Sequence, residues 1–182
     1  KNLEAKDLGT IVTKEVLKRS SLNPNDIDEL IMGQVLTGGA GQNPARQTAI
    51  HSGIPFDKTA YVINQVCGSG LRAVVAGYQT IKSNDSKIII AGGQESMSNA
   101  PHAISLNNGK KLEESNLVDT MIKDGLWDAF NGYHMGITAE NVASKWQITR
   151  KDQDDFALSS QLKAELAKKK NKFRDEIVSV KF

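Results

Sequence analysis

Three short apolar runs separated by helical patterns limit what this chain can fold into. The runs are Leu30–Leu36, Ala60–Val66 and Lys87–Ala91, and they are largely apolar on both alternating faces. Strands of that kind are buried on both sides, and when they alternate with helices they are typical of a parallel sheet covered by helices. Residues 1–97 are therefore predicted to form part of a layered α/β sheet.

Helical patterns lie between and after these runs. The first begins near Asp7, its expected N-cap, while Asn23–Pro24 and Asn43–Pro44 each place a capping residue before a proline suited to the first helical position. Thr138 and Thr149 are expected to cap two later helices. Apolar stripes at helical spacing are formed by Leu8, Ile11, Val12 and Val16, by Leu71, Val74, Val75 and Tyr78, and by Leu158, Leu162 and Leu166. The alternation of Ile177, Val178 and Val180 resembles a further strand.

Composition excludes several classes of protein. The net charge is +2 with acids and bases interspersed, which gives no reason to expect nucleic acid or a membrane surface as a partner. No apolar run approaches the roughly 20 residues that span a bilayer. A single cysteine excludes an internal disulfide and fits a reducing, cytoplasmic setting. The first residue is Lys1, not methionine, so we expect a piece of something longer.

The only cysteine stands where the second apolar run gives way to a helix. Cys67 is followed by Gly68, Ser69 and Gly70, so its sulfur is predicted at a helix N-terminus, where unpaired N–H groups and the helix dipole favour a thiolate. The glycines would let a ligand approach the backbone closely. Free cysteines are usually inert packing, but the position and the flanking glycines favour a nucleophile here.

The second half of the chain contains a long polar excursion, residues 102–123, of the kind that often forms a binding lid. His134 follows it between Tyr133 and Met135, where it could line a ligand channel, act as the base for Cys67, or simply be a core residue. No pair of histidines or carboxylates has metal-ligand spacing, and no Gly-x-x-x-x-Gly-Lys phosphate loop is present. We expect neither a metal nor a cofactor.

Five motifs taken together resemble the thiolase family. They follow one another in the family's order with matching spacing, and the likeness runs over the whole chain. The form of the fourth resembles the acetyl-CoA C-acetyltransferase (acetoacetyl-CoA thiolase) branch more than the long-chain 3-ketoacyl-CoA branch. The motifs are Gly41-Gln-Asn-Pro-Ala-Arg46, Asn64-Gln-Val-Cys-Gly-Ser-Gly-Leu71, Ala91-Gly-Gly-Gln-Glu-Ser-Met-Ser98, Tyr133-His-Met-Gly136 and Thr138-Ala-Glu-Asn141.

The resemblance implies a fold, a reaction and site residues. Residues 1–97 would be part of the thiolase N-terminal α-β-α domain, and residues 98–182 part of the inserted loop domain that binds coenzyme A. Cys67 would attack acetyl-CoA or acetoacetyl-CoA and become acylated before passing the acyl group on. The pantetheine and acyl pocket would be lined by Leu126, His134 and Met135, which makes His134 a binding residue and not the base. Coenzyme A thioesters are then substrates, and the parent protein would be a homodimer or homotetramer.

The chain departs from the family's pattern in extent. In thiolases a later part of the polypeptide carries two histidines and a second cysteine that complete the catalytic site, and none of these is present here. We therefore expect a segment that is inactive alone. The alternatives are a longer-chain 3-ketoacyl-CoA thiolase, a non-catalytic CoA-binding module, and a redox-sensing thiol, which the absence of a second cysteine disfavours.

Overall fold

The computed structural model of the chain describes residues 2–104 and 117–181. The contacts divide the chain into two units, which are described separately below. Unit 1 comprises residues 1–125 together with 180–182, and unit 2 comprises residues 126–179. The expected excursion over residues 102–123 lies partly outside the described residues, since its central part, 105–116, is not among them.

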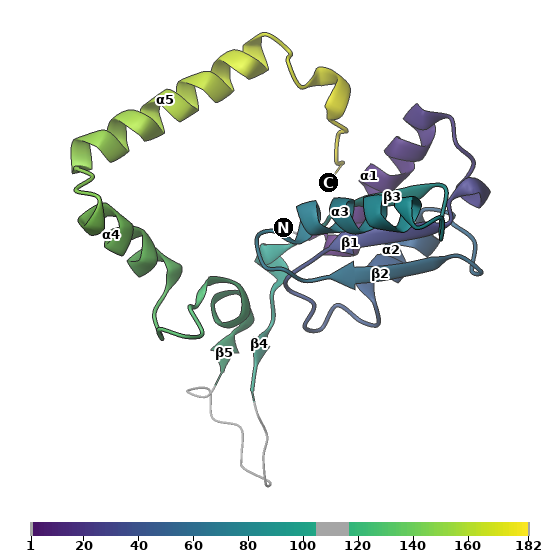
Figure 1. The fold of residues 1–182 in the computed structure, drawn as a ribbon, viewed down its shortest axis with the longest axis horizontal. Coiled ribbons are helices and arrows are strands. Elements are labelled where there is room, and N and C mark those ends of the chain that lie inside the picture. The colour runs from purple at the N-terminus through teal and green to yellow at the C-terminus, as the bar shows by residue number, and fades with distance from the viewer. Residues whose placement is uncertain (1, 105–116, 182) are drawn as a thin grey trace, which may run out of the picture. The chain divides into compact units, whose positions relative to one another are not determined.

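A three-stranded parallel sheet forms the centre of unit 1. Its strands are β1 (Glu29–Gly33), β2 (Thr59–Ile63) and β3 (Ile89–Gly93). They lie in the order β2-β1-β3, with Glu29 opposite both Thr59 and Ile89 (Figure 1). All three predicted strands are confirmed, and with them the prediction of a parallel α/β sheet.

Helices cover both faces of this sheet. Alternate side chains of each strand point to opposite faces, so Leu30 and Met32 face α2 (Pro44–His51), while Ile31 faces α3 (Ser69–Lys82). Helix α1 (Ala5–Ser20) packs against α2, outside the sheet. The main buried cluster lies on the α2 side and contains Leu17, Ile27, Leu30, Met32, Ala45, Ala49 and Ile54.

The apolar stripes predicted on α1 and α3 are not the faces that these helices bury. Apart from Leu17, the residues that face the interior are small, and they let the helix backbone come close to its neighbours. In α1 the buried residues are Ala5, Gly9, Thr13 and Leu17, and in α3 they are Ser69, Ala73 and Gly77. Within the described residues the predicted stripes are at most partly covered: Leu8 and Ile11 are half-buried, whereas Val16, Leu71, Tyr78 and Leu158 are each at least half exposed.

Only some of the helix N-caps predicted from the sequence are confirmed by the structure. Asp7 is not the N-cap of α1; Glu4 is, and Asp7 accepts a hydrogen bond from the Glu4 backbone N–H at 2.9 Å as the third helical residue. Thr138 does not cap α4 (Met135–Lys145), because the ring of His134 already accepts the N–H of Gly136 and starts the helix earlier. Thr149 caps α5 (Arg150–Lys169), as predicted.

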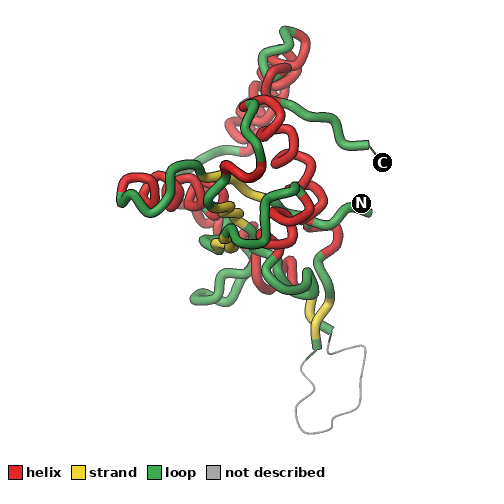
Figure 2. The backbone as a smooth tube through the Cα atoms, turned by 90° about the vertical axis from the view of Figure 1, so that its right-hand side faces the viewer, coloured by secondary structure: helices red, strands yellow, loops and turns green. Residues whose placement is uncertain are grey.

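The remaining described elements are short. They are the 3₁₀ turns η1 (Pro24–Asp26), η2 (Met97–Asn99) and η6 (Arg174–Glu176), the π-helical turn η5 (Met121–Leu126), and the antiparallel pair β4 (His102–Ala103) and β5 (Val118–Asp119). The strand predicted over residues 177–180 is wrong, since in the described structure this stretch belongs to no strand. Figure 2 shows it as loop at the C-terminal end of the tube.

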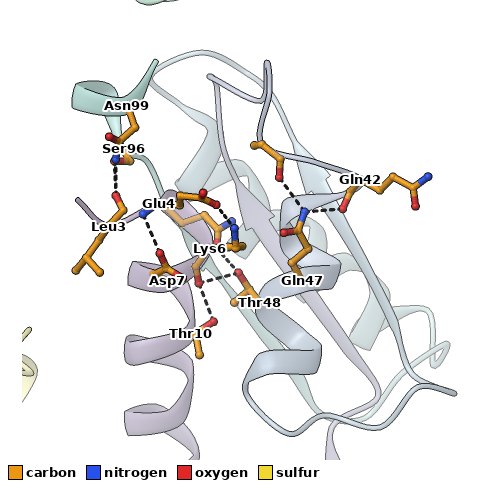
Figure 3. A network of polar contacts seen from close by, with 12 residues as sticks. Leu3, Glu4, Lys6, Asp7, Thr10, Gln42, Gln47, Thr48, Ser96 and Asn99 are labelled. Carbon is orange, nitrogen blue, oxygen red and sulfur yellow. Dashed lines mark hydrogen bonds and ion pairs between the residues drawn. The ribbon is translucent and has the colours of Figure 1, made fainter. Parts of the chain in front are cut away.

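Polar side chains fix the loops around α1 and α2 (Figure 3). The carbonyl of Leu3 accepts hydrogen bonds from Ser96 Oγ and Asn99 Nδ2, both at 2.7 Å. Gln47 Nε2 donates to the carbonyls of Ala40 and Gln42 at 2.9 and 2.8 Å. The glycine-rich stretch over residues 37–41 is therefore a tight turn held from α2.

Candidate active site

Cys67 lies in the turn that joins β2 to α3. Gly68 is the N-cap of α3, so Cys67 immediately precedes the cap, and it is exposed. The N–H groups of Gly68 and Ser69 donate within the turn, to the carbonyls of Gln65 and Val66. The helix dipole acts on an anion at Cys67, while these two donors are already engaged.

Close backbone packing places this turn over the sheet. A Cβ built on Gly33, at the end of β1, would lie 2.3 Å from the carbonyl carbon of Ser69, and one built on Gly93 would lie 3.4 Å from the Cα of Gly70. Only glycine allows the approach at Gly33, whereas the distance at Gly93 is that of an ordinary van der Waals contact. Since the carboxyl ends of parallel strands lie at one edge, Cys67 stands above the ends of β1 and β3, where ligands commonly bind in α/β sheets.

The turn itself has an unusual backbone. Val66 has φ +48°, a left-handed conformation that is an outlier for a β-branched residue. Ser69 braces it, since its Oγ donates to the carbonyl of Val66 at 2.6 Å and accepts from the N–H of Gln65 at 2.8 Å. Outliers of this kind cluster at functional sites, which agrees with a functional role for Cys67.

An open hollow of about 320 Å³ adjoins Cys67. Its walls come from the turn before α3 and from the segments that follow β1 and β3. The lining residues are Gly33, Gln34, Val35, Val66, Cys67, Ser69, Gly70, Gly93, Gln94 and Glu95. Space beside an exposed thiol suits the approach of an electrophilic carbonyl.

A buried hydrogen-bond chain supports this hollow. Gln94 Nε2 donates to Gln34 Oε1 at 2.9 Å, and Gln94 Oε1 accepts from Thr48 Oγ1 at 2.7 Å. Gln34 in turn donates to the carbonyl of Leu36 at 2.8 Å. Sequence reasoning assigned no role to Gln34, Gln94 or Glu95. The available signal was polar residues directly after strands, where β1 and β3 end at the same edge.

The other three predicted site residues lie in unit 2. Leu126 ends the π-helical turn η5 and is half-buried, whereas His134 and Met135 are exposed at the start of α4. His134 Nδ1 accepts from the Gly136 N–H at 3.0 Å, so the neutral ring carries its hydrogen on Nε2. That Nε2–H is a donor suited to a carbonyl oxygen. The arrangement of these three residues around Cys67 stays a prediction.

Asp128 shapes the loop before His134. Its carboxylate accepts from the side-chain amide of Asn131 and from the backbone N–H groups of Asn131 and Phe130, and these bonds hold the pKa of Asp128 below its usual value, against the opposing effect of burial. The Asp128 N–H also donates to the carbonyl of Tyr133 at 2.8 Å. The turn that presents His134 is thus held together by the carboxylate and the backbone N–H of one residue, Asp128.

Two absences concern only the described residues. Residues 2–104 and 117–181 hold no group of three or more His, Cys, Asp or Glu side chains arranged for a metal ion. Within the same ranges no helix has the length and apolar character to cross a membrane.

Comparison with known proteins agrees with this geometry. The model of the thiolase N-terminal domain matches residues 1–182. The acetyl-CoA acetyltransferase of Paracoccus denitrificans is 58% identical over 179 residues, which are 98% of this chain and 46% of that protein. The corresponding enzyme of Shinella zoogloeoides is 55% identical over 177 residues, which are 97% of this chain and 45% of that protein.

A solved structure of a thiolase is also similar to this chain. The Acat5 thiolase from Ascaris suum in complex with coenzyme A aligns with a TM-score of 0.91 and 41% identity, over 98% of this chain and 46% of that one. The chain is an α/β protein with a cysteine at the carboxyl edge of its sheet, and these matches show that it belongs to the thiolase family. It corresponds to the N-terminal domain and spans about half the length of the curated relatives it matches.

Proposed function

We propose that the polypeptide carrying these residues is an acetyl-CoA acetyltransferase in which Cys67 is the nucleophile. The observation that carries the proposal is the position of Cys67, exposed before α3 and beside the hollow at the carboxyl ends of β1 and β3. The relatives named acetyl-CoA acetyltransferase support acetyl-CoA as the substrate. The reaction joins two acetyl-CoA into acetoacetyl-CoA and CoA, or runs in reverse.

The first step is acyl transfer to sulfur. The Cys67 thiolate attacks the carbonyl carbon of acetyl-CoA, forming a new carbon–sulfur bond as the bond to the CoA sulfur breaks and CoA leaves as a thiolate. The acetyl group then passes to the α-carbon of a second acetyl-CoA, which gives up a proton. In the reverse direction, the acyl group passes from Cys67 to free CoA. Coenzyme A thioesters are therefore substrates, and the chemistry calls for no further cofactor.

Unit 2 would contribute to binding. Leu126, His134 and Met135 would line the pantetheine and acyl pocket, with His134 Nε2–H as a hydrogen-bond donor. We also propose that the boundary between the N-terminal α/β domain, residues 1–97, and the CoA-binding loop domain, residues 98–182, lies near residue 97. The resemblance to thiolases also supports a cytoplasmic location and a homodimer or homotetramer, and light scattering on the purified protein tests the oligomeric state.

An acyl-trapping experiment tests the nucleophile. The protein is incubated with acetyl-CoA, quenched in acid and mapped by peptide mass spectrometry. We expect one acetyl group on Cys67 and none in Cys67→Ala. An unmodified Cys67 would favour a non-catalytic CoA-binding module, and faster acylation by longer acyl-CoAs would favour a longer-chain thiolase.

The acyl-trapping experiment uses the native-length protein, because the 182 residues alone are expected to lack thiolase activity: the acid–base groups of the family's second half are not among them. Release of acetyl-CoA from acetoacetyl-CoA and CoA is the measurement, made on the isolated segment and on the native-length protein. Robust cleavage by the isolated segment would refute this expectation.

A further inference from the structure

Both ends of the Asn64 amide are hydrogen-bonded in the turn before Cys67. Its Oδ1 accepts from the backbone N–H of Val66 at 2.9 Å, and its Nδ2 donates to the carbonyl of Val35 at 3.4 Å. Asn64 therefore connects the turn between β2 and α3 to the segment that follows β1.

Val66 needs a restraint of this kind. A φ of +48° is unfavourable for a β-branched residue and persists only when surrounding contacts hold it. Without the bond from its N–H to Asn64, Val66 gains freedom to return to a negative φ. That change rotates the peptide between Val66 and Cys67 and moves the thiol.

The segment after β1 that accepts the hydrogen bond from Asn64 is itself held in place. Glu95, half-buried after β3, accepts from the N–H of Val35 at 2.8 Å and from the N–H of Leu36 at 3.3 Å. Asn64 is thus attached to a segment that a carboxylate holds against the sheet. The ends of β1, β2 and β3 are joined through two side chains.

We infer that Asn64 is a positioning residue for Cys67, acting through the backbone conformation of Val66. The inference rests on the proposed function for the reaction that Cys67 performs, but the positioning itself is a property of the turn. Misplacement of a reacting group by about 1 Å can cost about 100-fold in rate, so the loss of Asn64 should show in the rate of acylation.

The experiment uses the native-length protein and compares Asn64→Ala with a matched control. In Asn23→Ala the lost Oδ1 likewise accepts the N–H two residues on, at 3.0 Å, but Asn23 lies between α1 and β1 and does not line the hollow. Single-turnover acetylation of Cys67 is followed over a range of acetyl-CoA concentrations. Asn64→Asp keeps the acceptor for Val66.

We expect Asn64→Ala to lower the maximal acetylation rate about tenfold, with the half-saturating acetyl-CoA concentration unchanged. Asn64→Asp should recover most of the rate, and Asn64→Ala should cost less in a Val66→Gly background, where positive φ is no longer unfavourable. Asn23→Ala should keep the parent rate. A loss under threefold in Asn64→Ala, or an equal loss in Asn23→Ala, would overturn the inference.

Two further measurements keep the test decisive. If Asn64→Ala does not fold, Glu95→Gln replaces it, and a loss under threefold there overturns the inference. If the unsubstituted protein takes no acetyl group on Cys67, the proposed function fails, and iodoacetamide labelling of Cys67 decides the inference instead. A change of threefold or more in Asn64→Ala, without one in Asn23→Ala, supports it; a smaller change contradicts it.

Discussion

Gly33 and Ser69 meet backbone to backbone where β1 ends and α3 begins. The position of a Cβ on Gly33 is 2.3 Å from the carbonyl carbon of Ser69, 2.6 Å from its oxygen and 2.4 Å from the nitrogen of Gly70. Backbone atoms cannot rotate aside as the end of a side chain can. This contact therefore sets the distance between the sheet and the turn that carries Cys67.

Gly33→Ala should destabilise unit 1 by about 1–3 kcal/mol, the usual cost of overpacking a core. The matched control is Gly38→Ala, whose Cβ would meet only Pro101 Cγ, at an ordinary 3.7 Å. Urea denaturation followed by circular dichroism gives both values. Equal midpoints for the two variants would show that the contact is easily relieved.

Asn43 should be sensitive for two reasons. It caps α2 by accepting from the Arg46 N–H at 3.1 Å, and its Nδ2 donates to the Ala60 carbonyl at 2.9 Å, all at φ +40°. Asn43→Ala should cost about 1–2 kcal/mol of unfolding free energy. Asn43→Asp keeps the capping oxygen and should cost less. The same midpoint for both would argue against a capping role.

The pKa of Asp28 predicts a loss of stability in acid. Its carboxylate accepts from the backbone N–H groups of Lys87 and Ile88, and these bonds, helped by Lys58 and opposed by burial, lower the pKa of Asp28 from its ordinary value. A lowered folded-state pKa stabilises the fold above the unfolded value, about 3.9, and this stabilisation is lost as the pH falls through the folded value.

Asp28→Asn should therefore be less stable than the parent at neutral pH, and the difference should shrink as the pH falls below about 4. Urea midpoints measured from pH 7 to pH 3 follow this change. A difference that stays constant over the whole range would contradict the role of the charge.

His134→Asn separates two roles of one side chain. Asparagine is a good N-cap, so α4 should keep its start, whereas the imidazole Nε2–H is lost. We expect a rise in the KM for acetyl-CoA with little change in melting temperature, because the proposed role of His134 is in binding. An unchanged KM would limit His134 to capping α4.

The sequence predicts the sheet better than the helix faces. Runs such as Leu30–Leu36 predict buried strands because both of their faces are apolar, and β1 confirms this. Helical periodicity finds α3 but assigns the wrong face, since Ala73 and Gly77 pack where side-chain size, not hydrophobicity, decides. Capping motifs succeed where the geometry is local and complete, as at Thr149, and fail where an unexpected residue such as His134 supplies the acceptor.

In the candidate active site, too, local features were predictable from the sequence and long-range contacts were not. Cys67 was recognisable from its strand-to-helix position and flanking glycines, and its placement at the sheet edge follows from topology. The roles of Glu95 and Gln94 depend on which segments meet after folding: each contacts a residue 60 positions earlier in the chain. A single sequence read in local windows shows that these polar residues follow strands, but it does not show which of them pair.

The strand order also determines which strands can pair first while the chain is being synthesised. In register, Glu29 of β1 pairs with Thr59 and with Ile89, so its second neighbour lies 30 residues further along the chain than its first. At about 5–20 residues per second on the ribosome, β1, α2 and β2 have roughly 2–6 seconds to associate before β3 is made. We expect Cys67 to leave the ribosome before the segment after β3 that bears Glu95, so the contacts of Glu95 beside the cysteine turn form last.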